Sequence, residues 1–173
     1  MNWSDYFYYD ETSPSCLRWK VNRRVARKDA IAGCLKNVGS CRYWYVGLYG
    51  KQLKVHRVIW EMHNEPISNK TWIDHINGDG SDNKIDNMRL ATPSQNNQNK
   101  KLAINNKSGY KGVSFYNRLK KWKSSIEIEI DSNRKCITIG HFQTPEEAAR
   151  AYDKKAIELF GEFALTNEKL GLL

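Results

Sequence analysis

The segment from Thr71 to Lys101, TWIDHINGDGSDNKIDNMRLATPSQNNQNKK, most constrains what this chain folds into. A short run of β-forming residues ends at Asp74-His75, and a loop of Asn, Gly, Asp and Ser follows it. A second apolar run covers residues 88–91, and Thr92-Pro93 suits the N-cap and first position of a polar helix over 94–101. Such a hairpin with a helix buries little by itself, which indicates that it holds side chains in place.

The side chains of this segment suit metal and acid–base chemistry. A hard cation such as Mg²⁺ takes oxygen ligands, of which one or two come from protein and the rest from water and substrate phosphate. Asp74 with the carbonyl of one helix asparagine meets that need, and Asn96, Asn97 and Asn99 compete for the second place. His75 titrates near neutrality and is a candidate base for a water that attacks phosphorus.

Four short patterns surround this chemistry: His56-Arg57-x-Ile-Trp60, Asp74-His75-x-Asn77-Gly78, Asp86-Asn87-x-Arg89-Leu90-x-Thr92 and Gln95-Asn96-x-x-Asn99. Together they resemble the HNH endonuclease family, in particular the homing endonucleases of phage and bacterial introns. The resemblance implies a ββα-metal motif with one divalent ion, Mg²⁺ or Mn²⁺, in each active site. By resemblance, Asp74 and Asn96 bind the metal, His75 is the general base and Asn87 fixes the loop. Many members of the family carry His where this chain has Asn96.

The function implied is site-specific hydrolysis of phosphodiester bonds in double-stranded DNA, which leaves 5′-phosphate and 3′-hydroxyl ends. One alternative is a DNA-binding regulator whose nuclease motif has decayed, and the asparagine at position 96 leaves room for it. Another alternative is a binder of structured RNA. We expect a monomer without a small-molecule substrate.

Positive charge is concentrated in two stretches of the chain. There are 28 Lys and Arg against 19 Asp and Glu, so the formal net charge is +9. No acid occurs from Thr12 to Lys28 or from Asn87 to Ile126, and aromatic residues interrupt both runs, which favours a polyanion track over an ordinary solvated face. The DNA-binding candidates are Arg23, Arg24, Arg27, Arg89, Lys100, Lys101, Lys111, Arg118, Lys121, Trp122 and Lys123.

The predicted class is α+β, with three parts along the chain. Residues 1–99 form the nuclease domain, which begins with a small antiparallel sheet; 100–108 form a basic linker, and 109–173 form a DNA-binding domain. Apolar residues spaced three and four apart predict a helix over 55–63. His56 lies at an edge of its apolar face and is interpreted as a structural histidine, with a role at the phosphate as the alternative.

Residues 109–173 show the pattern of three strands followed by one helix. Apolar and polar residues alternate from Ile126 to Ile130, and Thr144-Pro145-Glu146-Glu147 is a strong helix start, with Gly161 as its end. With Tyr110-Lys-Gly-Val113, this segment resembles the plant ethylene-response-factor DNA-binding domain of the Apetala-two type. The resemblance implies a sheet that lies in the major groove. Lysine outnumbers arginine on the strands, so we expect more phosphate contact than base readout.

The four cysteines lack CxxC spacing, and no stretch looks like a signal peptide or a membrane span. A reduced, cytoplasmic protein is therefore expected. Two other metal sites fit the sequence less well. Cys16, Cys34 and Cys41 with His56 have irregular spacing for a structural zinc site, and a calcium loop over residues 77–83 would need glycine where the chain has aspartate.

Overall fold

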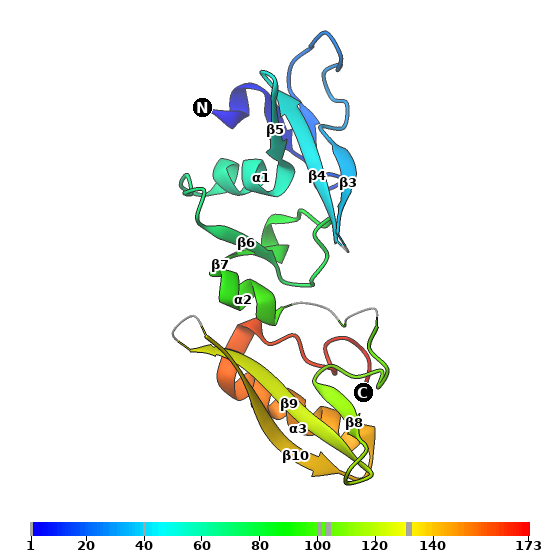
Figure 1. Cartoon of the computed structure of the whole chain (residues 1–173). Coiled ribbons are helices and arrows are strands. Elements are labelled where there is room, and N and C mark those ends of the chain that lie inside the picture. Colours follow the sequence, from blue (N-terminus) through cyan, green and yellow to red (C-terminus); the bar gives the residue numbers. More distant parts are fainter. Residues whose placement is uncertain (1, 40, 100–101, 103–104, 131–132) are drawn as a thin grey trace. The chain divides into compact units, whose positions relative to one another are not determined.

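The structure, a computed structural model of the chain, describes residues 2–39, 41–99, 102, 105–130 and 133–173 (Figure 1). Internal contacts divide the chain into two units, Met1–Thr92 and Pro93–Leu173, and each is described by itself. Four residues of the expected linker, 100, 101, 103 and 104, lie outside the described residues. None of the described helices is long and apolar enough to cross a membrane.

The first unit is built from short antiparallel strands and one helix. Two strands form a sheet near the N-terminus, three strands form the next sheet, and a final pair carries the segment from Thr71 onward. The elements are η1 (Trp3–Asp5), β1 (Phe7–Tyr9), β2 (Leu17–Trp19), β3 (Cys34–Val38), β4 (Cys41–Leu48), β5 (Lys51–Lys54), α1 (Val55–His63), β6 (Trp72–His75), η2 (Ile85–Asn87) and β7 (Met88–Ala91).

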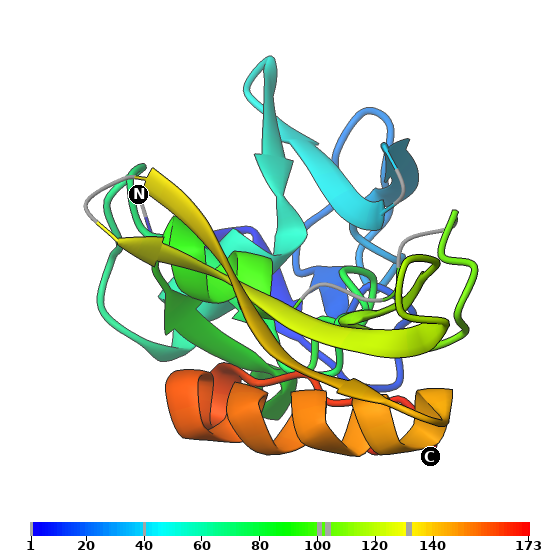
Figure 2. The same ribbon diagram turned by 60° about the horizontal axis from the view of Figure 1, so that its bottom comes forward.

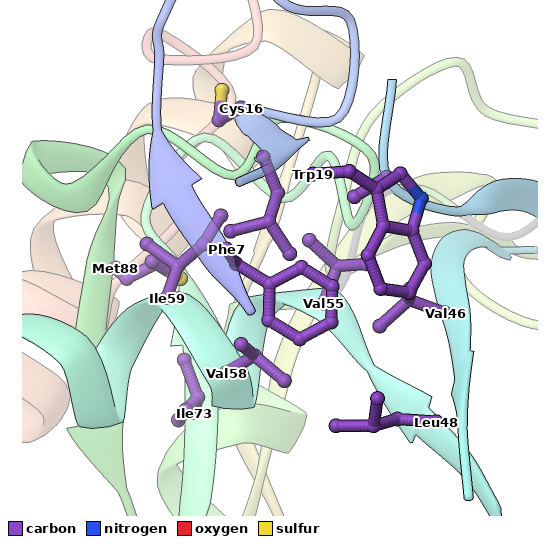
Figure 3. Packing of buried hydrophobic residues seen from close by; sticks show 12 residues of the cluster. Phe7, Cys16, Trp19, Val46, Leu48, Val55, Val58, Ile59, Ile73 and Met88 are labelled. Carbon is purple, nitrogen blue, oxygen red and sulfur yellow. The ribbon is translucent and has the colours of Figure 1, made fainter. Parts of the chain in front are cut away.

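Helix α1 covers the residues predicted for it and supplies the centre of the first core. Val55, Val58 and Ile59 recur at helical spacing, and all three are buried, so one face of the helix is fully covered. Figure 3 shows these side chains packed with residues of several strands, including Phe7 of β1 and Met88 of β7. Because the core joins the N-terminal strands to the β6–β7 pair, the early part of the chain supports the candidate site.

The second unit is a three-stranded antiparallel sheet with a helix on one face. The strand order is β10-β9-β8, and α3 lies along the sheet (Figure 2). The elements are α2 (Pro93–Gln98), β8 (Val113–Tyr116), β9 (Lys121–Ile130), β10 (Asn133–Phe142), α3 (Pro145–Phe160) and η3 (Gly161–Phe163). The predicted α+β class is confirmed, and the predicted helix start holds: Thr144 and Glu147 form a capping box, with Gly161 as the C-cap.

Alternation along β9 gives its two faces different chemistry. Ser124 and Ile126 are buried on the side that packs against α3, while Lys123 and Glu127 belong to the opposite side. Strand β9 is the central strand of the sheet, so its outward face is flanked by a strand on each side. We refer to this outward side of the sheet as the open face.

Candidate active site

Asp74 and His75 are the last two residues of β6, where they pair with Arg89 and Met88 of β7. The strand ends there because the chain turns: the amide of Gly78 donates to the carbonyl of His75 at 2.8 Å, and Gly78 has a φ of +65°. Only 4% of Asp74 and 5% of His75 is exposed. The carboxylate and the imidazole are therefore both held at the edge of the core.

Arg89 lies against Asp74. Its Nε and Nη2 both donate to Oδ2 of Asp74, at 2.9 and 2.8 Å. We predicted Arg89 as a DNA contact, whereas its guanidinium here compensates the charge of the candidate metal ligand.

Asn83 holds the imidazole of His75 and was not among the predicted site residues. The side-chain amide of Asn83, which is fully buried, donates from Nδ2 to the carbonyl of Ser15 at 3.2 Å. Its Oδ1 therefore faces Nε2 of His75 at 3.3 Å. Because Oδ1 can only accept, Nε2 carries the proton, and Nδ1 has the lone pair that accepts a proton. The sequence does not distinguish Asn83 from the other polar residues of its loop.

Asn87 ties together the loop that follows His75. Its Oδ1 accepts from the amide of Asn77 at 3.0 Å, and its Nδ2 donates to the carbonyl of Asp82 at 2.8 Å. Its carbonyl accepts from the amide of Ile76 at 2.8 Å. These bonds join both ends of the loop to the start of β7, a geometry that fits the role predicted for Asn87.

The polar side-chain oxygens of this loop accept hydrogen bonds from other residues of the same loop. Asp79 Oδ1 accepts from the amide and the hydroxyl of Ser81, at 3.0 and 2.7 Å. Gly80 lies against the ring of Tyr43, and a Cβ at Gly80 would come within 2.4 Å of that ring. The loop is thus a packed support, and its bonding does not resemble a calcium loop.

Two further rings line the buried side of His75. The ring of His56 meets that of His75 edge to face, with centroids 5.2 Å apart, and Tyr43 lies 5.6 Å from His56. Among the described residues, Nδ1 of His56 has no hydrogen-bond partner. Burial lowers the pKa of His56 well below its ordinary value. Burial also lowers the pKa of His75, and this outweighs the opposite effect of the hydrogen bond that His75 donates to Asn83, so the neutral imidazole is favoured.

The donor set fits a cation that needs few protein ligands. Within the described ranges, no three His, Cys, Asp or Glu side chains are grouped so that they could hold a metal ion. Cys16, Cys34, Cys41 and His56 therefore do not form a zinc site. A single carboxylate such as Asp74 suits Mg²⁺ or Mn²⁺, which keep water and phosphate as their other ligands.

The basic candidates of the first unit gather in the loop between β2 and β3. Arg24 and Arg27 are exposed there. Arg23 is half-buried, with its guanidinium carbon 5.1 Å from the ring centre of Trp19 and 5.4 Å from that of Tyr49.

The candidates of the second unit have different surroundings. Arg118 is exposed in the turn before β9, while Lys121 and Lys123 are half-buried at the start of the open face. Lys111 is half-buried, and its Nζ donates to the carbonyls of Gln98 and Leu165, at 2.8 and 3.1 Å. Burial lowers its pKa to about 8.

Trp122 also differs from the expectation, because it packs on the α3 side with Val113 and Ala149. Asp74, His75 and Asn87 lie together in the first unit, whereas Asn96 is a residue of α2 and belongs to the second unit. The candidates Lys100 and Lys101 lie outside the described residues.

One family profile and two curated relatives match this chain. Residues 53–98 match the sequence profile of the family described as HNH endonuclease, so the chain carries an HNH endonuclease domain. The chain is 38% identical over 74 residues to Protein 3.8 of Escherichia phage T7. The matched stretch covers 43% of this chain and 61% of that protein. It is 35% identical over 133 residues to a protein of Acanthamoeba polyphaga mimivirus named as an uncharacterized HNH endonuclease. That match covers 72% of this chain and 66% of the viral protein.

The chain thus spans just under two thirds of the length of these two relatives. No solved structure matches the chain.

Proposed function

We propose that this chain is a metal-dependent endonuclease of double-stranded DNA, whose catalytic part is the HNH domain at residues 53–98. The observation that carries the proposal is the arrangement at the end of β6. There the imidazole of His75 is held by Asn83 and follows Asp74 directly in the chain. A general base must be held in one tautomer and be neutral at the working pH, and the surroundings of His75 meet both needs.

In this mechanism His75 takes a proton from the attacking water through Nδ1, while its Nε2–H stays bonded to Asn83. Asp74 would hold the divalent ion, with Asn96 as the second ligand by resemblance to the family. When bound, Mg²⁺ or Mn²⁺ stabilises the charge that develops on the phosphate and on the leaving 3′ oxygen. The hydroxide formed attacks phosphorus, the bond from phosphorus to the 3′ oxygen breaks, and the leaving oxygen takes a proton from water, so the products are 5′-phosphate and 3′-hydroxyl ends.

The DNA-binding part of the proposal rests on the distribution of charge. In the second unit, exposed or half-exposed cations gather near the turn between β8 and β9, namely Arg118, Lys121 and Lys123. Glu127 and Glu129 are exposed further along the open face, so the phosphate contacts belong at the turn end of the sheet. We propose, from its resemblance to the ethylene-response-factor domain, that this end anchors the protein on the duplex.

Site specificity of the homing type is the finer part of the proposal. The test is incubation of the protein with a plasmid pool that carries randomised inserts, in Mg²⁺ and in EDTA. Cleavage in Mg²⁺ alone, with recurring sequences at the recovered ends, is the expected result. Nicked circles point to one active site acting on one strand, whereas linear products point to cutting of both strands.

His75→Ala distinguishes catalysis from binding, with His63→Ala as the matched control in the same unit. We expect His75→Ala to abolish cleavage while binding of the recovered target in EDTA stays nearly intact, and His63→Ala to cleave like the wild type. Full cleavage by His75→Ala would overturn the assigned base. Binding without Mg²⁺-dependent cleavage by the wild type would favour the DNA-binding regulator.

A further inference from the structure

The loop between β2 and β3 ends in a narrow tip that exposes an apolar side chain. Arg23 and Ala26 form an antiparallel bridge: the amide of Arg23 donates to the carbonyl of Ala26 at 2.7 Å, and the amide of Ala26 donates back at 3.3 Å. Arg24 and Val25 form the two-residue turn. Val25 is 90% exposed, more than any other large hydrophobic side chain in the described part of the chain.

The base of this loop is well anchored (Figure 1, the blue loop that precedes β3). The amide of Lys28 donates to Oδ1 of Asn22 at 2.9 Å, which closes the loop across six residues. Asp29 accepts at its carbonyl from Arg18 Nη1 at 2.9 Å and at Oδ1 from the hydroxyl of Tyr8 at 3.0 Å. Hydrogen bonds at the base of the loop therefore hold the tip in place.

The surface around the tip is positive. Arg24, Arg27 and Lys28 are exposed, and no acid occurs between residues 12 and 28. The first acid after this run, Asp29, is engaged by the stem. The tip therefore presents one apolar side chain within a group of cations.

Valine is a poor choice for such a turn on local grounds. Neither Arg24 nor Val25 has a positive φ, so the turn backbone itself does not exclude valine. A β-branched side chain at this apex is nevertheless stiff, and its apolar surface gains nothing in water. A single exposed apolar residue is ordinary on a protein surface. Here, however, Val25 stands at the apex of a tight turn with Arg24 beside it, so the residue suits a contact made at the tip.

We infer that this tip is a wedge for the DNA minor groove, in which Val25 presses against a base step and Arg24 and Arg27 lie along the groove and its phosphates. The inference rests on the proposed function, since it takes double-stranded DNA as the partner. The minor groove is about 6 Å wide, so a narrow two-residue tip suits it better than a broad element does. Its negative potential attracts arginine, and apolar wedges there unstack a step and bend the duplex.

The experiment measures bending by energy transfer between dyes at the two ends of a short duplex. The duplex is selected by the wild-type protein from a randomised pool, and all measurements are made in EDTA. Val25→Ser is compared with Ile157→Ser, which changes an exposed apolar residue on α3. We expect the wild type and Ile157→Ser to bend the duplex, whereas Val25→Ser binds about tenfold more weakly and leaves it straight.

Arg24→Ala separates the cations from the wedge. We expect it to weaken binding and to reduce the salt slope by about one, while the bound duplex is still bent. A bound duplex that is straight with the wild type, or equally bent with Val25→Ser, overturns the wedge. No selection of any duplex by the wild type overturns DNA binding as a whole. Because cleavage does not take place in EDTA, loss of the wedge and failure of the nuclease proposal are distinguished.

Discussion

Arg89 directs two donors, Nε and Nη2, at one oxygen of Asp74, at 2.9 and 2.8 Å. The side chains are 14% and 5% exposed, so the pair is largely removed from water. A buried carboxylate needs a nearby positive charge, and Arg89 provides it from the facing position of β7. Arg89 therefore belongs to the structure of the candidate site.

Removal of Arg89 should destabilise the first unit. Arg89→Met leaves Asp74 buried without its counter-ion, and we expect a loss of about 3 kcal/mol in the free energy of unfolding. Asp74→Asn together with Arg89→Met should cost less than the sum of the single changes, because the double variant buries no unpaired charge. Urea unfolding of the four proteins gives these values. Additive costs would show that the pair does not couple.

The control for this prediction is an exposed ion pair of the second unit. Lys155 donates to Glu158 at 2.6 Å, with side chains 31% and 60% exposed. Lys155→Met should change stability by less than about 1 kcal/mol. A cost as large as that of Arg89→Met would mean that charge removal in general, rather than burial, is responsible.

Asn83 should matter for the rate of cleavage more than for DNA binding. Asn83→Ala removes the acceptor that holds Nε2 of His75, so the imidazole is free to turn. We expect single-turnover cleavage to fall by about tenfold or more, with affinity in EDTA unchanged. Asn64→Ala, a change at an exposed asparagine of the same unit, serves as the control. Equal rates for Asn83→Ala and the wild type would contradict the positioning role.

The sequence was a good guide where periodicity and local chemistry decide the structure. The helix at 55–63 follows from apolar spacing, and the strand that ends at Asp74-His75 follows from the Asn-Gly turn behind it. The capping box at Thr144 follows from four consecutive residues. In each of these cases the deciding interactions lie within a few residues along the chain.

Prediction from sequence failed where distant segments meet. Asn83 acquires its role through Ser15, 68 residues away. Lys111 follows the pattern of a basic DNA contact, yet it is half-buried and its Nζ donates to the carbonyls of Gln98 and Leu165, which are distant from it in the sequence. A pattern of neighbouring residues in the sequence cannot predict these contacts, because they form only when distant segments pack together.

Stability should depend on pH through His56. Burial lowers its pKa, and the electrostatic effects of Lys54, Arg57 and the neighbouring His75 act in the same direction. Below about pH 6.5 the unfolded chain binds a proton at His56, whereas His56 in the folded chain stays neutral. Stability therefore falls with pH by up to about 1.4 kcal/mol per unit from this residue. The drop begins near the unfolded value and continues down to the folded one.

His56→Leu tests this linkage. The leucine cannot be protonated, and it removes a buried nitrogen that lacks a hydrogen-bond partner among the described residues. We expect the unfolding free energy, measured in urea between pH 7 and pH 5, to fall less steeply with pH in the variant than in the wild type. The difference between the two slopes should correspond to about one fewer proton taken up on unfolding. Equal slopes would show that the folded protein protonates His56 as readily as the unfolded chain does.

Gly112 should be intolerant of any side chain, and Gly109 provides the matched control. Both have a positive φ, +75° and +77°. A Cβ at Gly112 would lie 1.9 Å from the ring of Tyr152, whereas one at Gly109 meets nothing within 4 Å. Gly109→Ala should therefore cost only backbone strain, about 1–2 kcal/mol. Gly112→Ala adds the clash with a buried ring and should lower the melting temperature much further. Equal shifts for the two variants would mean that Tyr152 moves freely, against its packing between α3 and the sheet.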